Sequence, residues 1–280
     1  MSLHHVTSSI CKDESLVRIC SSSNSPFING VDELYLVITQ EAMSGHAVNY
    51  YKVNGKTIEK RKVREQELMK SILVDGNRQM TQWILLGEAL ADPMGRIESL
   101  RREMKNQSSL AYKKKIFLDF AAFVRKYMEA KEFLGSGHLL DSFNSILQSL
   151  NHWARLAILG VGEHPETTVW EQIKVIDPSV YKLYEELVTS IEPLDKRVEL
   201  LLLALDFAVM SMMERCVAFV LDILRSKDTP WTVAEILDHP SIADPNFDLF
   251  LLLEKMVKRS LIREHSLLKD GVQEKCYSIF

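Results

Sequence analysis

The chain has 280 residues, of which 46% are hydrophobic and 26% are charged, and its net charge is −4. This composition supports well-packed domains and excludes both a disordered chain and a strongly basic protein that binds nucleic acid without sequence preference. The four cysteines are widely spaced, so we expect neither a disulfide framework nor a zinc site. We find no leader-like start and no apolar run of membrane-spanning length, so we expect a cytoplasmic protein without membrane contact.

Strand patterns dominate the first part of the chain. Residues 34–39 form a continuous apolar, β-branched run, which is typical of a buried strand. Residues 47–53 and 56–63 are further strand candidates, and the Asn54-Gly55 pair between them is a strong hairpin signal. The sequence therefore predicts a sheet within the first hundred residues.

Helical periodicity follows this predicted sheet. It covers residues 65–73 and 78–86 and ends at a turn-rich boundary over residues 87–93. We therefore predict an α+β domain with a mixed sheet over residues 1–93.

The middle of the chain is almost wholly helical. Apolar residues recur at intervals of three and four over residues 116–127, 139–156 and 198–212. Long helices with short connections favour an antiparallel bundle, which we assign to residues 94–212.

The last segment has a different pattern. A helix that ends at Leu224 is followed by helical patterns over residues 234–238 and 247–259, and then by a hairpin whose turn is at residues 269–271. Three helices and a hairpin predict a winged helix over residues 213–280.

The charge of this predicted winged helix argues against DNA binding. From Glu214 to Phe280 there are nine Lys and Arg residues against eleven Asp and Glu residues, and two of these acids, Asp244 and Asp248, lie near the start of the expected recognition helix. Because phosphate neutralisation dominates DNA affinity, a packing or partner-binding role is favoured over DNA.

One stretch near the N-terminus has the layout of a phosphate-and-metal site. Ser22, Ser23 and Asn24 stand where a phosphate-binding turn is expected, and Asp32 stands at the start of the buried strand, where a first Mg²⁺ ligand is expected. The second carboxylate is missing, because its position is Leu34. A serine-rich loop and an aspartate that ends a turn are the plainer alternatives.

A third carboxylate would have to come from an adjacent strand. Glu59 is the best placed residue for it, although a solvated strand face explains it equally well. Glu33 is expected to point to the opposite face of the sheet from Asp32. If the protein is active, Mg²⁺ bound by Asp32 and Glu59 is the expected cofactor.

A polar helix face and the loop after it form a second candidate site. His152 and Arg155 continue a face that also carries Asp141, and the loop that follows contains His164 and Glu166. Arg155 suits a phosphate, and Glu166 suits a catalytic general base. The alternative is that these residues form ordinary ion pairs within the bundle.

Several segments resemble bacterial nucleotidyltransferase-like proteins of uncharacterised function. The resemblance covers nearly the whole chain and rests on Asp32 with residues 36–38, and on residues 83–88, 127–133, 151–157, 164–170, 180–190 and 196–204. It implies a degenerate nucleotidyltransferase domain, a helical domain of the substrate-binding type and a winged-helix tail.

The layout is also distantly similar to that of aminoglycoside nucleotidyltransferases. This similarity implies a nucleotide-binding cleft between residues near Asp32 and the segment from Asp141 to Glu166. We expect a protein that binds a nucleotide or another phosphorylated ligand, and the incomplete metal motif argues against transfer. The alternative is a non-enzymatic, ligand-sensing regulator that acts through its winged helix on DNA or a protein. The oligomeric state is left open, with a homodimer as one alternative.

Overall fold

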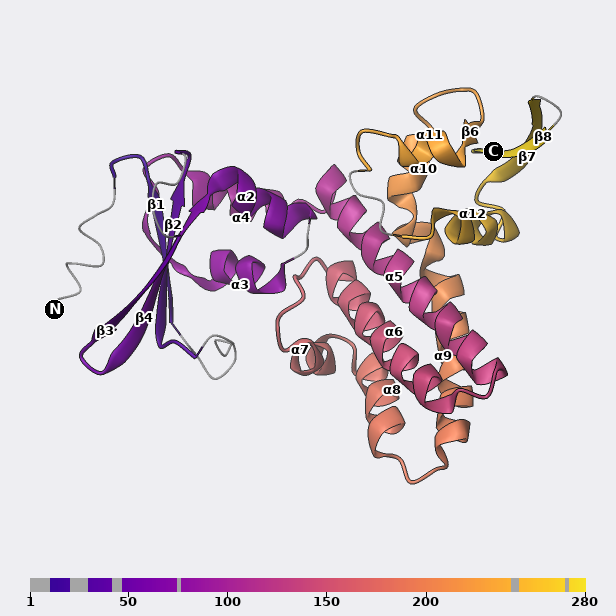
Figure 1. Ribbon diagram of the computed structural model, residues 1–280, viewed down its shortest axis with the longest axis horizontal. Coiled ribbons are helices and arrows are strands. Elements are labelled where there is room, and N and C mark those ends of the chain that lie inside the picture. The colour runs from indigo at the N-terminus through magenta and orange to yellow at the C-terminus, as the bar shows by residue number, and fades with distance from the viewer. Residues whose placement is uncertain (1–10, 21–29, 42–46, 75–76, 243–246, 270–271) are drawn as a thin grey trace. The chain divides into compact units, whose positions relative to one another are not determined.

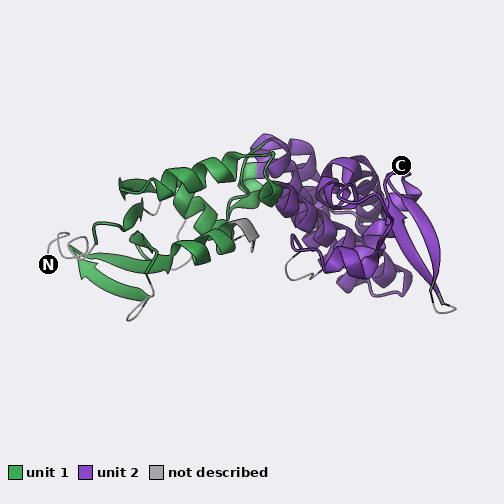
Figure 2. Cartoon of the chain, turned by 90° about the horizontal axis from the view of Figure 1, so that it is seen from above, with its two compact units in different colours: residues 1–112, 162–172 green, residues 113–161, 173–280 purple. Residues whose placement is uncertain are grey.

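The computed structural model describes residues 11–20, 30–41, 47–74, 77–242, 247–269 and 272–280. The chain divides into two compact units, which Figure 2 distinguishes by colour. Unit 1 comprises residues 1–112 and 162–172, and unit 2 comprises residues 113–161 and 173–280. The predicted phosphate-binding residues Ser22, Ser23 and Asn24 lie outside the described residues.

Unit 1 is built on a five-stranded mixed sheet (Figure 1). Its strands, in the spatial order β3-β4-β2-β1-β5, are β1 (Ser15–Cys20), β2 (Glu33–Thr39), β3 (Val48–Val53), β4 (Lys56–Arg64) and β5 (Glu88–Ala91). The β2 and β4 strands are parallel, and the other pairs are antiparallel. The predicted mixed sheet is thus confirmed, and β5 lies within the segment that we predicted to be only a turn-rich boundary.

The β3–β4 hairpin turns at the pair that the sequence indicated. Asn54 and Gly55 both have positive φ, at 51° and 81°. Two consecutive residues of positive φ match the right-handed twist of the flanking strands, and Asn-Gly is the pair that adopts them at least cost.

Helices cover one face of this sheet. They are α2 (Glu65–Met69), the π-helical turn η1 (Lys70–Val74), α3 (Arg78–Leu86) and α4 (Arg96–Lys105). Leu34, Leu36 and Ile38 of β2 pack against this layer together with Trp83 and Leu100. Because side chains alternate along a strand, the residues between them, such as Tyr35 and Val37, form a separate cluster on the other face.

Gly87 joins α3 to β5 at a point of close approach. A Cβ atom at this position would collide with the side chain of Val17 and with the carbonyl oxygen of Trp83. Only glycine therefore lets the end of α3 pack directly on β1.

The long helices of unit 2 form the predicted antiparallel bundle. The helices of this part of the chain are α5 (Leu110–Gly135), α6 (Leu139–Gly160), α7 (Val169–Ile176), α8 (Pro178–Thr189) and α9 (Leu194–Cys216). Two buried serines of α6 hold it close to α5: Ser142 donates to the carbonyl of Ala130 at 2.8 Å, and Ser149 donates to that of Phe123 at 3.2 Å.

The C-terminal part of unit 2 has the predicted winged-helix pattern. It contains α10 (Ala218–Leu224), β6 (Trp231–Thr232), α11 (Val233–Leu237), α12 (Leu249–Lys258), β7 (Arg263–Lys269) and β8 (Val272–Ser278). Its small sheet has the order β6-β8-β7. Thr232 and Glu235 form a reciprocal capping box that fixes the start of α11.

Within the described ranges, we find no helix whose length and apolar character would suffice for a membrane span.

Candidate functional site

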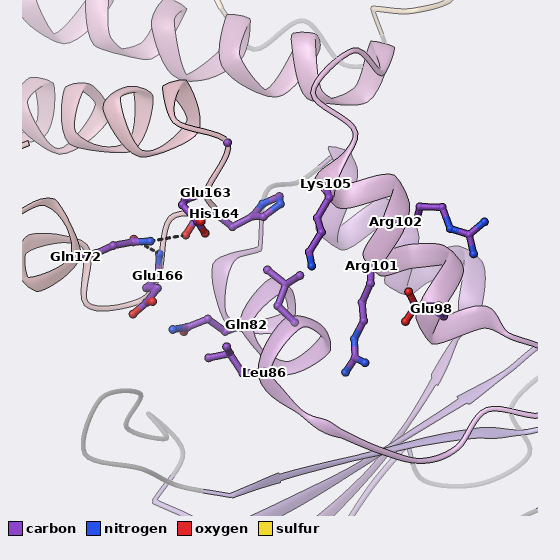
Figure 3. A pocket seen from close by; sticks show the side chains of 12 residues that line it. Gln82, Leu86, Glu98, Arg101, Arg102, Lys105, Glu163, His164, Glu166 and Gln172 are labelled. Atoms are coloured by element: carbon purple, nitrogen blue, oxygen red, sulfur yellow. Dashed lines mark hydrogen bonds between the residues drawn. The ribbon is translucent and has the colours of Figure 1, made fainter. Parts of the chain in front are cut away.

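A cavity of unit 1 lies between α3, α4 and the loop over residues 162–168. Its volume is about 700 Å³, which is the size of a small-molecule site. Figure 3 shows this pocket. It is lined by Gln82, Leu85, Leu86, Glu98, Arg101, Arg102, Lys105, Gly162, Glu163, His164, Glu166 and Gln172.

Hydrogen bonds hold the 162–168 loop in place over the pocket. The side chain of Gln172 donates from Nε2 to the carbonyl of His164 at 2.9 Å, and its Oε1 accepts from the backbone N–H of Glu166 at 2.9 Å. The His164 Nε2 atom lies 2.9 Å from the carbonyl oxygen of Met104, at the end of α4. These bonds tie the loop both to α7 and to α4, so its side chains are positioned before any ligand arrives.

Gln82 provides a buried amide at the pocket wall. Only 6% of this residue is exposed, and its Oε1 accepts from the backbone N–H and the hydroxyl of Thr167, at 3.3 and 3.1 Å. Within the described residues its buried Nε2 has no hydrogen-bond partner. Because a buried donor without a partner is costly, this amide is suited to a ligand that supplies an acceptor.

The α4 side of the pocket is basic. Arg101 donates from Nε to the carbonyl of Ile84 in the last turn of α3 at 2.8 Å and from Nη2 to the carbonyl of Gly87, just after the helix, at 2.6 Å, so its position is fixed. Lys105 is exposed, one helical turn further on, and points into the cavity beside Arg101 in Figure 3. Arg102 points away from the centre of the cavity in the same view.

The loop side of the pocket is acidic. Burial raises the pKa of Glu166, against the opposing effect of a hydrogen bond from Thr168, and the charge of Glu163 adds a smaller contribution in the same direction as burial. A carboxyl group with a raised pKa can hold a proton closer to neutral pH, which suits a general acid or base. The predicted residues His164 and Glu166 thus lie in one pocket.

Asp32 lies just before β2 and is exposed. Its Oδ2 accepts from the backbone N–H of Thr57 at 2.7 Å, and its own N–H donates to the carbonyl of Thr57 at 2.9 Å. Asp32 therefore links the start of β2 to β4. Its role as a metal ligand stays a prediction.

Glu59 lies on β4 beside Leu34, with which it is paired in register. Both residues are fully buried, and the carboxylate of Glu59 accepts from Arg61 at 2.7 Å. The guanidinium of Arg61 also lies 5.4 Å from the centre of the Trp83 ring. An arginine therefore supplies the positive charge next to Glu59.

These surroundings do not fit a two-metal site. The described residues contain no group of three or more His, Cys, Asp or Glu that could hold a metal ion. Glu33 is directed to the other face of the sheet, where it binds Lys56 at 2.8 Å and Arg18 at 3.2 Å. Burial opposes ionisation of Glu33, but the hydrogen bond from Lys56 and the charge of Arg18 outweigh it and lower its pKa.

His152 and Arg155 belong to unit 2, where both meet Asp119 of α5. The Nδ1 atom of His152 lies 3.1 Å from the buried Asp119 carboxylate, and Arg155 lies 2.9 Å from the same oxygen. The two predicted ligand-binding residues thus lie close together within the bundle, because both contact the same carboxylate of Asp119. A role for them in ligand binding stays a prediction.

Comparison with known proteins identifies each part of the chain. Residues 13–109 match the family model described as nucleotidyltransferase-like, residues 113–212 match the YgxA-like substrate binding domain, and residues 218–277 match a helix-turn-helix domain. The uncharacterized protein YgxA of Bacillus subtilis (strain 168) is 32% identical over 241 residues, which cover 86% of this chain and 82% of YgxA.

The chain belongs to the YgxA family. A crystal structure of a nucleotidyltransferase-like protein from Exiguobacterium sibiricum 255-15 has the same architecture, with a TM-score of 0.77 and 25% identity over 99% of this chain and 97% of that one. The resemblance to nucleotidyltransferase-like proteins with a winged-helix tail is confirmed.

In this member of the YgxA family, the basic residues of the pocket were not among the sequence predictions. Gln82, Arg101 and Lys105 all lie within the nucleotidyltransferase-like match. One signal was available, because the segment over residues 96–105 carries three arginines and a lysine among ten residues. Its helical pattern was assigned to the bundle, and so its charges were not considered with the sheet domain.

Proposed function

We propose that this protein binds a nucleotide or another phosphorylated small molecule in the pocket between α3, α4 and the 162–168 loop. We further propose that it does so without metal-dependent nucleotidyl transfer. The observation that carries the proposal is the arrangement of complementary groups around one cavity: the cations Arg101 and Lys105, the buried amide of Gln82 and the carboxyl group of Glu166.

The α4 side suits the phosphate groups. Lys105 is exposed and has a long, flexible side chain, and the guanidinium of Arg101 is held by two carbonyl oxygens. A mobile and a fixed cation together can follow a phosphate chain of variable geometry. Among the described residues, neither cation has a carboxylate within ion-pair distance.

The opposite side suits the uncharged part of the ligand. Gln82 offers an amide donor, and Leu85 and Leu86 add apolar surface at the same wall. A nucleoside has both the acceptors and the flat apolar face that such a wall can contact.

Transfer is disfavoured by the residues around β2. A two-metal mechanism needs carboxylates that converge on two cations. Leu34 is apolar, Glu59 is engaged by Arg61, and these groups do not fit Mg²⁺. Ligand binding that does not depend on Mg²⁺ is the function that agrees with this chemistry.

The first test uses the pocket lysine. Binding of ATP, CTP, GTP and UTP to the full chain would be measured by calorimetry for the wild type and Lys105→Ala, with Lys182→Ala on α8 as a matched control on an exposed helical lysine. Loss of a charge-assisted bond to phosphate should weaken binding about tenfold in Lys105→Ala and leave the control unchanged. Equal affinities in all three proteins would contradict the proposed site.

A ligand-sensing regulator is the second candidate, because residues 218–277 match a helix-turn-helix domain. In this case the same pocket would bind the ligand, and the winged helix would act on a partner. Its net acidic composition favours a protein partner over DNA.

A further inference from the structure

Helix α9 carries an exposed apolar stripe along one side. The stripe consists of Leu200, Leu203, Phe207 and Met210, which are 54%, 70%, 75% and 41% exposed. The opposite side of α9 is buried in the bundle through residues such as Val198 and Leu205. A surface helix normally has one apolar side, so a second one indicates a further contact.

The spacing of this α9 stripe is that of a helix-pairing seam. Its residues are separated by three, four and three positions, as in a heptad pattern. The same alternation places Lys196 four residues before Leu200 and Glu214 four residues after Met210, and both are exposed. The six positions span about 27 Å at 1.5 Å per residue.

Opposite charges, Lys196 and Glu214, continue the line of the stripe at its two ends, and Lys196 also pairs with Glu199 of its own helix at 2.9 Å. The line from Lys196 to Glu214 is therefore complementary to itself when it is reversed. In an antiparallel pair of two such helices related by a two-fold axis, Leu203 faces Phe207 of the other copy, Leu200 faces Met210, and Lys196 faces Glu214. In a parallel pair, each lysine would instead face a lysine and each glutamate a glutamate. Charge complementarity therefore selects the antiparallel arrangement.

We propose that the α9 stripe binds the α9 stripe of a second copy of this chain, in an antiparallel, two-fold symmetric dimer. Such an interface uses the same patch on both copies, as two-fold symmetry requires. Phe207 and Leu203 lie at its centre, where truncation of large apolar groups costs most. This inference is independent of the ligand pocket, since α9 lies in unit 2.

Sedimentation velocity of the full chain over a concentration series tests the contact. The wild type should form dimers, and Phe207→Glu should raise the dimer dissociation constant about 30-fold or more, because a charge is placed at the apolar centre. Leu140→Glu changes a leucine of similar exposure, 73%, on α6 and should leave dimerisation unchanged. Circular dichroism establishes that each variant is folded.

Charge exchange tests the orientation. Lys196→Glu alone and Glu214→Lys alone should each weaken the dimer, and the double variant should restore it, because opposite charges again face each other. A parallel pair would show no such restoration. Two results would overturn the proposal. The first is a wild type that stays monomeric at about 100 µM, a concentration at which even a weak dimer would be seen. The second is a dimer that Phe207→Glu does not weaken.

Discussion

Arg61 binds the fully buried carboxylate of Glu59 at 2.7 Å, directly beside Leu34 on the neighbouring parallel strand. In the sequence, Leu34 occupies the position expected for a second metal carboxylate, and Glu59 was the candidate for a third. In the structure, the guanidinium of Arg61 compensates the charge of Glu59, and the alkyl side chain of Leu34 stands where the second metal carboxylate is expected. The positive charge beside Glu59 is therefore supplied by a side chain of the protein itself.

This pair leads to a prediction about stability. Arg61→Ala should destabilise the fold by about 2 to 4 kcal/mol, because it removes the cation that compensates a buried carboxylate. Urea denaturation measures the change. Arg64→Ala is the matched control on the same strand: it breaks an exposed pair with Glu67 and should cost less than about 1 kcal/mol. Similar costs for the two variants would mean that Arg61 does not compensate Glu59.

Gln82 allows a sharp test of the pocket. Gln82→Glu keeps an oxygen that can accept from Thr167 but replaces the Nε2 donor by a second oxygen. Nucleotide affinity should fall about tenfold or more, because the wall loses the Nε2 donor and gains a negative charge that no acceptor of the ligand can compensate. Calorimetry checks this, with Gln66→Glu, an exposed glutamine of α2, as the control. Undiminished affinity would remove Gln82 from the site.

Lys115 on α5 should make stability depend on pH. Burial lowers its pKa to about 8, with the charge of Arg155 acting in the same direction and that of Asp119 against it. Between pH 8 and 10.5 Lys115 is deprotonated in the folded protein and still protonated in the unfolded chain. The contribution of Lys115 to the free energy of unfolding therefore rises with pH over this range. Below pH 8 the charge of this partly buried side chain should cost up to about 3 kcal/mol.

The measurement for Lys115 is a comparison with Lys115→Met. The variant should be more stable at pH 7, and its advantage should shrink between pH 8 and 10. Cys216, whose pKa burial raises to about 11, titrates in both proteins and cancels in the difference. A stability difference that stays constant over this range would contradict a lowered pKa at Lys115.

The winged helix should bind DNA poorly. Lys275 of β8 is occupied by Glu254 at 2.7 Å and Glu264 at 3.1 Å, and α12 begins with the capping carboxylate of Asp248. Lys275 is thus less available to phosphates, and the whole segment from Glu214 to Phe280 is net acidic. At 150 mM salt, about physiological, a mobility shift with random duplex DNA should show no binding in the low micromolar range. A clear shift there would favour the regulator that acts on DNA.

Much of the fold could be predicted from local patterns. The apolar run at residues 34–39 became β2, and Asn54-Gly55 became the β3–β4 turn. The β1 and β5 strands were missed, because neither has strong alternation and β5 has the helix-favouring sequence Glu-Ala-Leu-Ala. Their pairing with the sheet overrides local propensity.

The site was harder to predict than the fold. His164 and Glu166 lie in the loop that the sequence indicated, but the residues that complete their pocket come from α3 and α4, about 60 to 80 residues earlier in the chain. Arg155 has the right chemistry for a phosphate, but in the structure it forms an ion pair with Asp119 of α5. The spacing of residues along one helix does not reveal such a contact with another helix. Sequence periodicity places a residue on a face and leaves its partner undetermined.

We propose above that this protein binds a nucleotide or a related phosphorylated ligand without a metal ion. Calorimetry with ATP, CTP, GTP and UTP, each in Mg²⁺ and again in excess EDTA, tests it most directly. We expect at least one nucleotide to bind with similar affinity in both conditions. Binding that appears only with Mg²⁺, or no binding of any nucleotide, would contradict it.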